Sequence, residues 1–379
     1  MRKVDLITGF LGSGKTTFLK RYADYLVRSG GNIGIIENDH GAVNVDMLLL
    51  QELLGTNCDL EMVTGGCDLE THMRRLKTKL ISFGMRGAGR VLVEPSGIFD
   101  VDEFFDVLRE EPLDRWYEIG SVIAIVDAKL EDDLSEQSNY MLASQIANAG
   151  KVIISRSQES TRDDLRHTIR HLNEVMEMFG CKRRFFCSEP NLGPDSTRQT
   201  VEVSLTPDLS EFPGKEKVSP TSFADPEKGD VSPKPSAGPE KGDVSPDPRS
   251  DVLSKNWDDL TDDDFAGIAS CGYILEDHVK LPFDRENDYD SVYIFKARTT
   301  EEDLLRRIRS LFADSSYGNI FRIKGFMPLE DGSWIELNAT HRSIEVKPIE
   351  HGQEIFIVIG EGLHKDRIVT HWADIMGEM

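Results

Sequence analysis

A glycine-rich stretch near the start of the chain restricts the possible folds more than any other feature of the sequence. Residues 9–17 read Gly-Phe-Leu-Gly-Ser-Gly-Lys-Thr-Thr, which fits the GxxxxGK[ST] phosphate-loop pattern. An apolar run at residues 4–8 precedes this stretch, and residues 16–28 have apolar side chains at helical spacing. Both context requirements of the motif, a strand before it and a helix after it, are therefore met. The sequence predicts a phosphate-binding loop at the start of an α/β domain.

The residue types in this loop suit the binding of a nucleotide's phosphates. Glycines allow successive backbone N–H groups to point into one concavity, and the start of the following helix adds partial positive charge. The lysine reaches the terminal phosphates, and the hydroxyl group after it ligates Mg²⁺. We therefore predict nucleotide binding by Gly12, Ser13, Gly14, Lys15, Thr16 and Thr17, with Mg²⁺ at Thr16.

Short apolar runs alternate with helical patterns through the first part of the chain. Strand and helix repeated in this order predict a P-loop NTPase domain of the α/β class, with a mostly parallel, doubly wound sheet. Ligands of such sheets bind beyond the carboxyl ends of the strands. The predicted strands are residues 4–8, 33–37, 91–94, 122–127 and 152–155, and the predicted helices are residues 16–28, 73–83, 101–108, 140–149 and 163–178.

A Pro-rich segment interrupts this pattern. Residues 206–250 hold nine of the sixteen prolines and repeat PEKGDVSP at 226–233 and 239–246, a composition that cannot bury a core. After it, strand-like runs at residues 291–298 and from Ile320, Trp334, Ile344 and Glu354, with helical patterns at 300–314 and 364–376, indicate a small, mostly antiparallel α+β domain. We expect a nucleotide-binding domain over residues 1–205, a disordered linker over 206–256 and an α+β domain over 257–379.

Charge and composition exclude several classes of partner. The 379 residues carry a formal net charge of -23, which repels nucleic acids and anionic membrane surfaces. No apolar run approaches the roughly 18–20 residues that span a bilayer. The five cysteines are widely spread and form no CxxC pair, so we predict a cytoplasmic protein with reduced thiols.

A second segment with suitable chemistry ends one of the predicted strands. Residues 91–97 read Val-Leu-Val-Glu-Pro-Ser-Gly. In a phosphate-loop protein, a carboxylate at this place serves Mg²⁺ or orients the attacking water, and a glycine brings a backbone N–H towards the γ-phosphate. We assign Glu94 to catalysis and to the magnesium site, and Gly97 to nucleotide binding.

Together these residues resemble the CobW-like P-loop GTPases, relatives of the nickel-enzyme maturation GTPases. The resemblance implies a metallochaperone or metal-cofactor insertase that hydrolyses GTP to deliver a metal to a client protein. It also implies that Asp39 acts in the first switch loop as a catalytic residue that senses magnesium or metal, with His40 beside it. The matching segments are residues 9–17, 37–41 with Asp46, 94–97, 122–127, 293–298, 323–326 and 356–360 with Gly362 and Leu363.

The chain departs from the family at the metal motif. Where the family has Cys-x-Cys-Cys, residues 65–70 read Gly-Gly-Cys-Asp-Leu-Glu, so that Cys67 matches alone. Thiolates favour Zn²⁺ and similar ions, and Glu70, His72 or Cys58 can complete a mixed ligand set. Cys67, Glu70 and His72 are our candidate ligands for Zn²⁺ or another divalent transition metal. The alternative is that Cys67 is an ordinary buried thiol and binds no metal.

A second departure concerns the base. The family's Asn-Lys-x-Asp reads Ser155-Arg156-Ser157-Gln158 here, and the neutral Gln158 removes a charge-assisted pair with guanine worth roughly 1.5–3 kcal/mol. Arg156 can still stack over a purine. We therefore expect nucleotide binding through the phosphates with eroded guanine selectivity, and GTP and ATP both stay open as ligands.

Three functions fit these residues. The first is a magnesium-dependent nucleoside triphosphatase coupled to metal delivery, with Lys15, Glu94 and Asp39 in catalysis, a metalloprotein as client and a homodimer as one hypothesis. The second is a nucleotide-binding regulatory or scaffold protein with little hydrolysis and no metal, which the two departures favour. The third is a small-molecule kinase whose extra domain covers the substrate.

Overall fold

The computed structural model describes most of the chain outside the Pro-rich segment. The described residues are 1–39, 50, 54–55, 57–64, 69–97, 99–131, 134–187, 249–276, 278–280, 289–329 and 331–377. Within them, no helix has the length and apolar character needed to cross a membrane.

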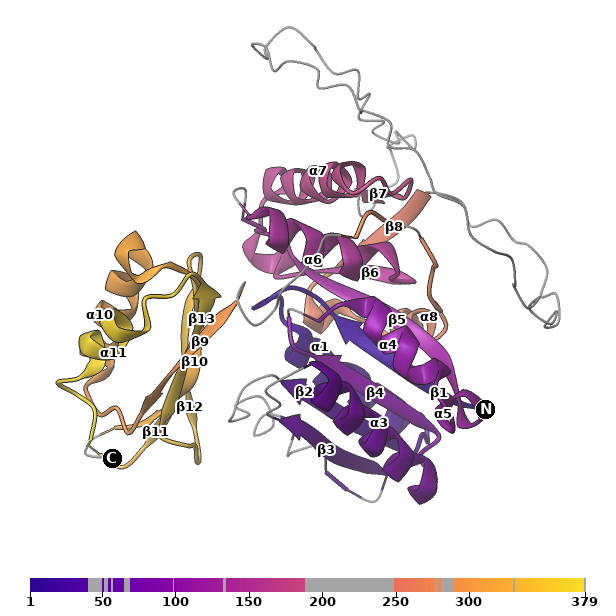
Figure 1. Ribbon diagram of the computed structural model, residues 1–379, viewed down its shortest axis with the longest axis horizontal. Coiled ribbons are helices and arrows are strands. Elements are labelled where there is room, and N and C mark those ends of the chain that lie inside the picture. The colour runs from indigo at the N-terminus through magenta and orange to yellow at the C-terminus, as the bar shows by residue number, and fades with distance from the viewer. Residues whose placement is uncertain are drawn as a thin grey trace, which may run out of the picture. The chain divides into compact units, whose positions relative to one another are not determined.

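An eight-stranded sheet forms the framework of the nucleotide-binding region (Figure 1). Its strand order is β3-β2-β4-β1-β5-β6-β8-β7, and every pairing between neighbours is parallel. The carboxyl ends of all these strands therefore meet at one edge. The strands are β1 (Arg2–Thr8), β2 (Ile33–Asp39), β3 (Cys58–Thr64), β4 (Arg90–Pro95), β5 (Tyr117–Asp127), β6 (Lys151–Ser155), β7 (Arg184–Cys187) and β8 (Arg249–Ser254).

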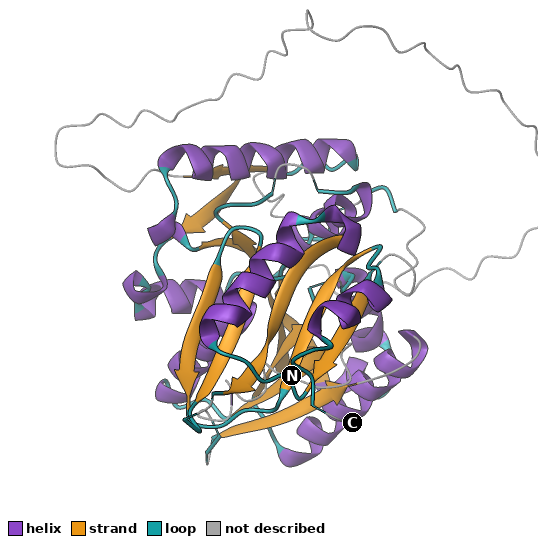
Figure 2. Ribbon diagram, turned by 90° about the vertical axis from the view of Figure 1, so that its left-hand side faces the viewer, coloured by secondary structure: helices purple, strands orange, loops and turns teal. Residues whose placement is uncertain are grey.

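Helices cover both faces of this sheet. Figure 2 shows the helices of the protein in purple and its strands in orange. Strand β5 shows why both faces are covered, since Val122 and Ala124 join one buried cluster while Ile123 and Ile125 join the cluster on the opposite face. Both faces of the strand are apolar, which is the pattern of a parallel sheet buried on two sides. Helices α3 (Leu69–Arg86), α4 (Val101–Arg109), α5 (Leu113–Trp116), α6 (Glu136–Ala147) and α7 (Arg162–Met178) pack on the first face, and α1 (Lys15–Arg28) and α8 (Asp262–Ala269) pack on the second.

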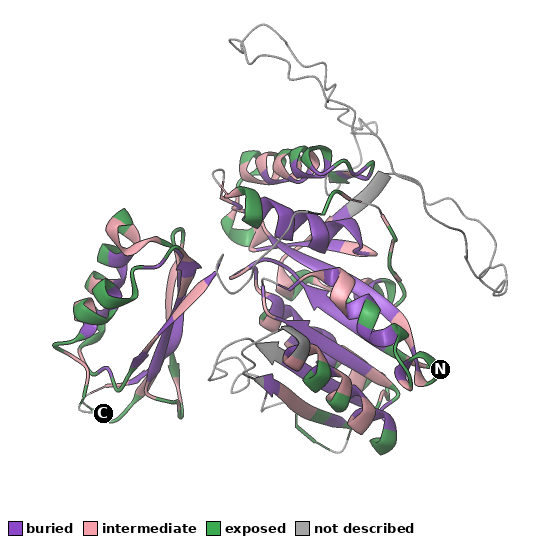
Figure 3. Ribbon diagram, viewed as in Figure 1, coloured by how far each residue is buried: buried purple, intermediate pink, exposed green. Residues whose placement is uncertain are grey.

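A second, five-stranded sheet has the order β12-β11-β10-β13-β9, with antiparallel pairing throughout. Its core contains Leu304 and Ile308 of one helix and Trp372 of another, packed against alternate strand residues such as Ile294 and Val358. The buried side chains of both sheets lie along the strands (Figure 3). The elements are β9 (Asp290–Phe295), α10 (Glu301–Ala313), β10 (Asn319–Pro328), β11 (Trp334–Thr340), β12 (Ile344–Ile349), β13 (Ile355–Glu361) and α11 (Lys365–Trp372).

The predicted fold class is confirmed, and each predicted strand and helix has a counterpart within a few residues of its expected bounds. The structure adds a strand that the sequence analysis did not identify, β3, which begins at Cys58 and pairs with β2. The helix predicted at residues 300–314 begins where its cap was expected, because the Thr300 side chain accepts a hydrogen bond from the Asp303 N–H.

The chain divides at a different place from the one expected. Residues 249–254, which the expected division assigns to the linker, form β8 between β6 and β7 of the first sheet. Residues 262–269, expected in the last domain, form α8, and its Phe265 packs in the same cluster as Phe18 of α1. The physical reason is local, since the Pro-rich composition stops at Pro248 and Val252 and Leu253 are again apolar.

Candidate functional site

The phosphate loop joins β1 to α1 at the carboxyl edge of the parallel sheet. Gly12 and Gly14 have φ angles of 77° and 94°, a region that favours glycine. Gly14 is the N-cap of α1, and no side chain caps the helix there. Gly14 has no side chain that could accept a hydrogen bond from the first backbone N–H groups of α1, and such a helix N-terminus is suited to binding phosphate.

Gly9 holds the start of the loop against the neighbouring strand. Its φ is 147°, and a Cβ built on it would lie 2.2 Å from the Ile125 carbonyl oxygen of β5. A larger residue would have to move the backbone of one element or the other. The same Cβ would lie 2.8 Å from Ser13 Oγ, which is buried and has no hydrogen-bond partner among the described residues.

Lys15, the first residue of α1, folds its side chain back over the loop. Its Nζ donates hydrogen bonds to the carbonyl oxygens of Gly9 at 2.9 Å and of Phe10 at 3.4 Å. The residue is 6% exposed, so the ammonium group is held over the loop rather than in solvent. Thr17, in contrast, is exposed on the first turn of the helix.

Thr16 and Glu94 meet at the same edge although they are far apart in the sequence. Thr16 Oγ1 donates a hydrogen bond to Glu94 Oε1 at 2.7 Å, and Glu94 is 4% exposed at the end of β4. A hydroxyl oxygen and a carboxylate oxygen are the hard ligands that Mg²⁺ prefers, and Mg²⁺ sites often use one or two such groups with the substrate's phosphates. The residues predicted for magnesium therefore fit that ion.

The register of β2 and β4 brings a second carboxylate to this place. Glu37 is paired with Glu94 across the two strands and is 3% exposed. The sequence analysis included Glu37 in a matching segment but gave it no role. Asp39, the predicted switch residue, is the last residue of β2, paired with Thr64 of β3. Its side chain, like His40, lies outside the described part of the structure.

Gly97 lies directly against the phosphate loop. A Cβ at this position would approach within 2.6 Å of the Leu11 backbone nitrogen and 2.9 Å of the Leu11 Cα. Such contacts are too short for any side chain, so the close approach of the two backbones requires glycine. The structure thus brings together the loop, Glu94 and Gly97.

The base motif differs from the expectation in the partner of Arg156, a residue that we expected to stack over a purine. Arg156 follows β6 with a φ of 53°, a left-handed conformation that costs energy for a side chain of this size and occurs often at functional sites. Its Nη1 donates to Asp127 Oδ2 at 2.5 Å, and the two side chains are 13% and 18% exposed. The guanidinium is therefore occupied by an ion pair at the end of β5. Gln158 is exposed.

The segment from Ser254 to Trp257 lies next to the base motif and the phosphate loop. The sequence analysis did not assign it to the site. Ser254, the last residue of β8, has its Oγ 3.2 Å from Ser157 Oγ. Trp257 packs on Phe18, with ring centroids 5.7 Å apart, and its Cζ2 would lie 3.8 Å from a Cβ built on Gly14. The available signal was the apolar pair Val252 and Leu253 directly before Ser254, as at the end of the other strands.

The predicted transition-metal ligands are only partly within the described residues. Cys67 and the side chain of Glu70 lie outside them, and His72 is 1% exposed on α3. Cys58 begins β3, and the strand ends six residues later at Thr64, roughly 20 Å away. Burial raises the pKa of the Cys58 thiol to about 11, which disfavours the thiolate form that binds a metal. Within the described ranges, no three His, Cys, Asp or Glu side chains gather as a metal site.

Known proteins resemble this chain mainly over the first sheet. The model of the CobW/HypB/UreG nucleotide-binding domain matches residues 3–180. The zinc chaperone YeiR of Escherichia coli K12 is 28% identical over 164 residues, which cover 42% of this chain and 48% of YeiR. The zinc chaperone YjiA of the same organism is 30% identical over 166 residues, which cover 41% of this chain and 49% of YjiA. The chain thus matches about half the length of these curated relatives.

Two solved structures are also similar. The Zn(II)-bound YjiA GTPase from E. coli aligns with a TM-score of 0.32 and 17% identity, covering 99% of each chain. The hydrogenase maturation factor HypB from Archaeoglobus fulgidus aligns with a TM-score of 0.30 and 15% identity, covering 46% of this chain and 76% of HypB. Over residues 3–180, which hold the phosphate loop, Glu94 and Asp127, the chain is similar to the CobW/HypB/UreG family of nucleotide-binding domains.

Proposed function

We propose that the protein is a magnesium-dependent nucleoside triphosphatase that hydrolyses GTP, with relaxed base selectivity, to drive the delivery of a metal ion to a client metalloprotein. The observation that carries this proposal is the pairing of Thr16 with Glu94 at 2.7 Å, directly beside a phosphate loop whose lysine is held over the loop. These are the parts that phosphoryl transfer to water requires.

The chain's own residues have distinct tasks in this reaction. The α1 N-terminus and the amides around Gly12 and Gly14 bind the phosphates, and Lys15 exchanges its two carbonyl partners for the terminal phosphate oxygens. The buried carboxylate of Glu94 keeps a negative group at the strand end, where it orients water for in-line attack. Thr16 and Glu94 would hold Mg²⁺, which would neutralise part of the charge on the phosphates.

Zinc is the metal that we propose as cargo. The curated relatives YeiR and YjiA are both zinc chaperones, and Cys67, three residues after Thr64 in the sequence, supplies one soft ligand. Glu70 and His72, three and five residues further on, provide oxygen and nitrogen ligands from the start of α3. A site with a single thiolate is expected to bind zinc more weakly than one with three.

Phosphate release tests the enzymatic part of the proposal. Wild-type protein with Mg²⁺ should release phosphate from GTP, and Lys15→Ala should abolish the release. Lys20→Ala, a change of the same side chain later in α1, is the matched control and should keep wild-type activity. Binding of GTP without hydrolysis overnight would instead favour the regulatory protein, and no binding of GTP or ATP would overturn the proposal.

Zinc titration tests the cargo. Wild-type protein should bind zinc with a stoichiometry that falls in Cys67→Ser, whereas Cys181→Ser, which changes a buried cysteine of the same domain, should bind zinc as the wild type does. Identical zinc binding by all three proteins would remove the Cys67 site.

A further inference from the structure

We infer that Gln145 of α6 is a positioning residue that orients Gly97 for recognition of the γ-phosphate, an inference that rests on the proposed function. Gln145 Nε2 donates a hydrogen bond of 2.9 Å to the Gly97 carbonyl oxygen. Gln145 is fully buried in the middle of the domain, on a helix distant in the sequence from the phosphate loop and from the Glu94 segment.

The contact acts on a glycine, whose backbone dihedral angles are less restricted than those of other residues. A Cβ at Gly97 would clash with the Leu11 backbone, so no side chain can supply this restraint in its place. The hydrogen bond from Gln145 fixes the peptide plane that follows Gly97. The plane that precedes Gly97, which carries its N–H, is left to turn towards a phosphate. Gln145 thus restrains the Gly97 carbonyl group and leaves the Gly97 N–H able to rotate towards the γ-phosphate.

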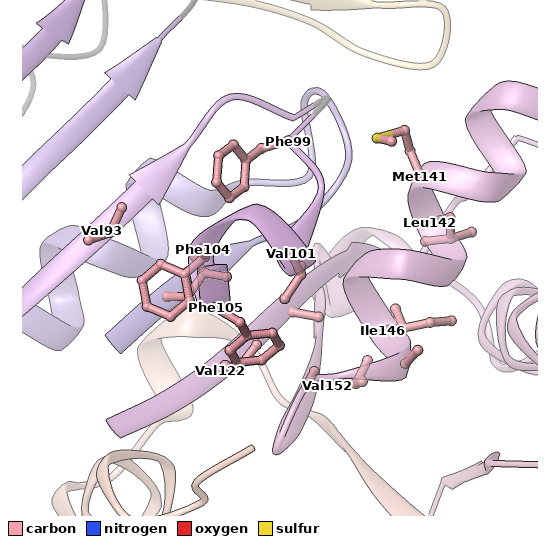
Figure 4. Close-up of a cluster of buried hydrophobic side chains, with 14 of the residues drawn as sticks. Val93, Phe99, Val101, Phe104, Phe105, Val122, Met141, Leu142, Ile146 and Val152 are labelled. Atoms are coloured by element: carbon pink, nitrogen blue, oxygen red, sulfur yellow. The ribbon is translucent and has the colours of Figure 1, made fainter. Parts of the chain in front are cut away.

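Helix α6 holds the rest of the loop as well. Ser144 Oγ donates to Asp100 Oδ1 at 2.8 Å and accepts from the Val101 N–H at 3.3 Å. Phe99 and Val101 belong to the same buried cluster as Met141 and Ile146 of α6 (Figure 4). The loop after Gly97 is therefore anchored on a rigid element, and positioning residues are effective when their own surroundings are fixed.

The Gln145 side chain also has an unused acceptor. Its Oε1 is buried and has no hydrogen-bond partner among the described residues. Buried polar atoms without partners are uncommon in folded proteins and need an explanation. Here the same amide that donates to the Gly97 carbonyl oxygen also presents a buried acceptor beside the segment that follows β4.

The test compares triphosphate and diphosphate, because a merely structural role would not distinguish them. Gln145→Met keeps the volume and removes the donor. We expect its rate of GTP hydrolysis and its preference for GTP over GDP each to fall about tenfold, with GDP affinity within about twofold of the wild type. Gln145→Asn, which keeps the amide on a shorter side chain, should show the same losses and serves if the methionine variant does not fold.

The matched control removes a buried amide from the same helix without touching the loop. Asn139 of α6 bonds to His171 and to the Leu134 carbonyl oxygen, so Asn139→Ala should lower stability and leave the GTP-to-GDP preference unchanged. Wild-type rates and preference in Gln145→Met, or equal weakening for GTP and GDP, would overturn the role of Gln145 alone. If the wild-type protein binds neither GTP nor ATP, the proposed function fails and this inference fails with it.

Discussion

The two halves of the nucleotide site are built differently. The phosphate half uses backbone groups, glycines and the hydrogen-bonded Thr16–Glu94 pair, all set by β1, β4 and α1. The base half uses side chains at the ends of β5, β6 and β8, and there an ion pair between Arg156 and Asp127 occupies the place of the family's base motif. Phosphate binding is thus set by the fold. Base recognition depends on a few side chains, and these can change without disturbing the fold.

The largest effect should come from the phosphate half. Glu94→Gln keeps the shape of the side chain and removes its charge from the magnesium site, so we expect GTP hydrolysis to fall on the order of 10²–10³-fold while nucleotide still binds. Single-turnover phosphate release measures the rate. Glu118→Gln, near the opposite end of the sheet, is the control. If Glu94→Gln hydrolyses GTP at the wild-type rate, the strand-end carboxylate has no catalytic role.

The next effect should come from the base half. Gln158→Asp restores the carboxylate that guanine recognition requires, so we expect the GTP-to-ATP affinity ratio to rise roughly tenfold or more, in line with charge-assisted hydrogen bonds of about 1.5–3 kcal/mol. Gln158→Asn has the same length and no charge, and should leave the ratio unchanged. Titration of each variant with both nucleotides gives the ratio. An unchanged ratio in Gln158→Asp would mean that the Arg156–Asp127 pair, rather than Gln158, sets base selectivity.

A measurement of unfolding free energy tests how strongly the fold itself sets the phosphate half of the site. Gly9→Ala places a Cβ against the Ile125 carbonyl oxygen, so we expect the free energy of unfolding to fall by about 1–3 kcal/mol. Gly267→Ala is the control, because nothing lies within 4 Å of a Cβ at that helical position and alanine favours a helix over glycine. Urea unfolding of the two variants should therefore shift in opposite directions.

The smallest effect should come from the ion pair of the base half. Asp127→Asn removes the partner of a largely buried guanidinium, and because both side chains keep some exposure we expect a loss of about 1–2 kcal/mol of unfolding free energy. Phosphate release in this variant should stay within about threefold of the wild type, since Arg156 does not touch the phosphate loop in any hydrogen bond described here. A large loss of hydrolysis would show that the two halves are coupled.

The sequence was sufficient to predict the features that are set by residues close together in the chain. The phosphate loop, its flanking strand and helix, and the Glu94 and Gly97 positions all follow from local patterns, and the structure brings them to one edge because the strands are parallel. Strand β8 was not predicted, because the Pro-rich segment directly before it led us to assign these residues to the linker. Gln145 was not predicted as a positioning residue, because its hydrogen-bond partner Gly97 is 48 residues away in the sequence. A helical pattern does not distinguish a buried amide that holds a distant loop from any other residue on the buried face.

The pairing of β7 with β8 gives the chain unusual freedom in length. Cys187, the last residue of β7, lies opposite Val252, and Arg249, the first residue of β8, lies opposite Arg184. The two ends are thus separated by about three residues of strand rise, roughly 10 Å. Because the cost of closing a loop grows only slowly with its length, the intervening stretch can be shortened or extended with little effect on the sheet. Strands β8, β6 and β5 lie between β7 and β1, so changes of length there occur away from the strand that leads into the phosphate loop, and this part of the protein is free to diverge in size.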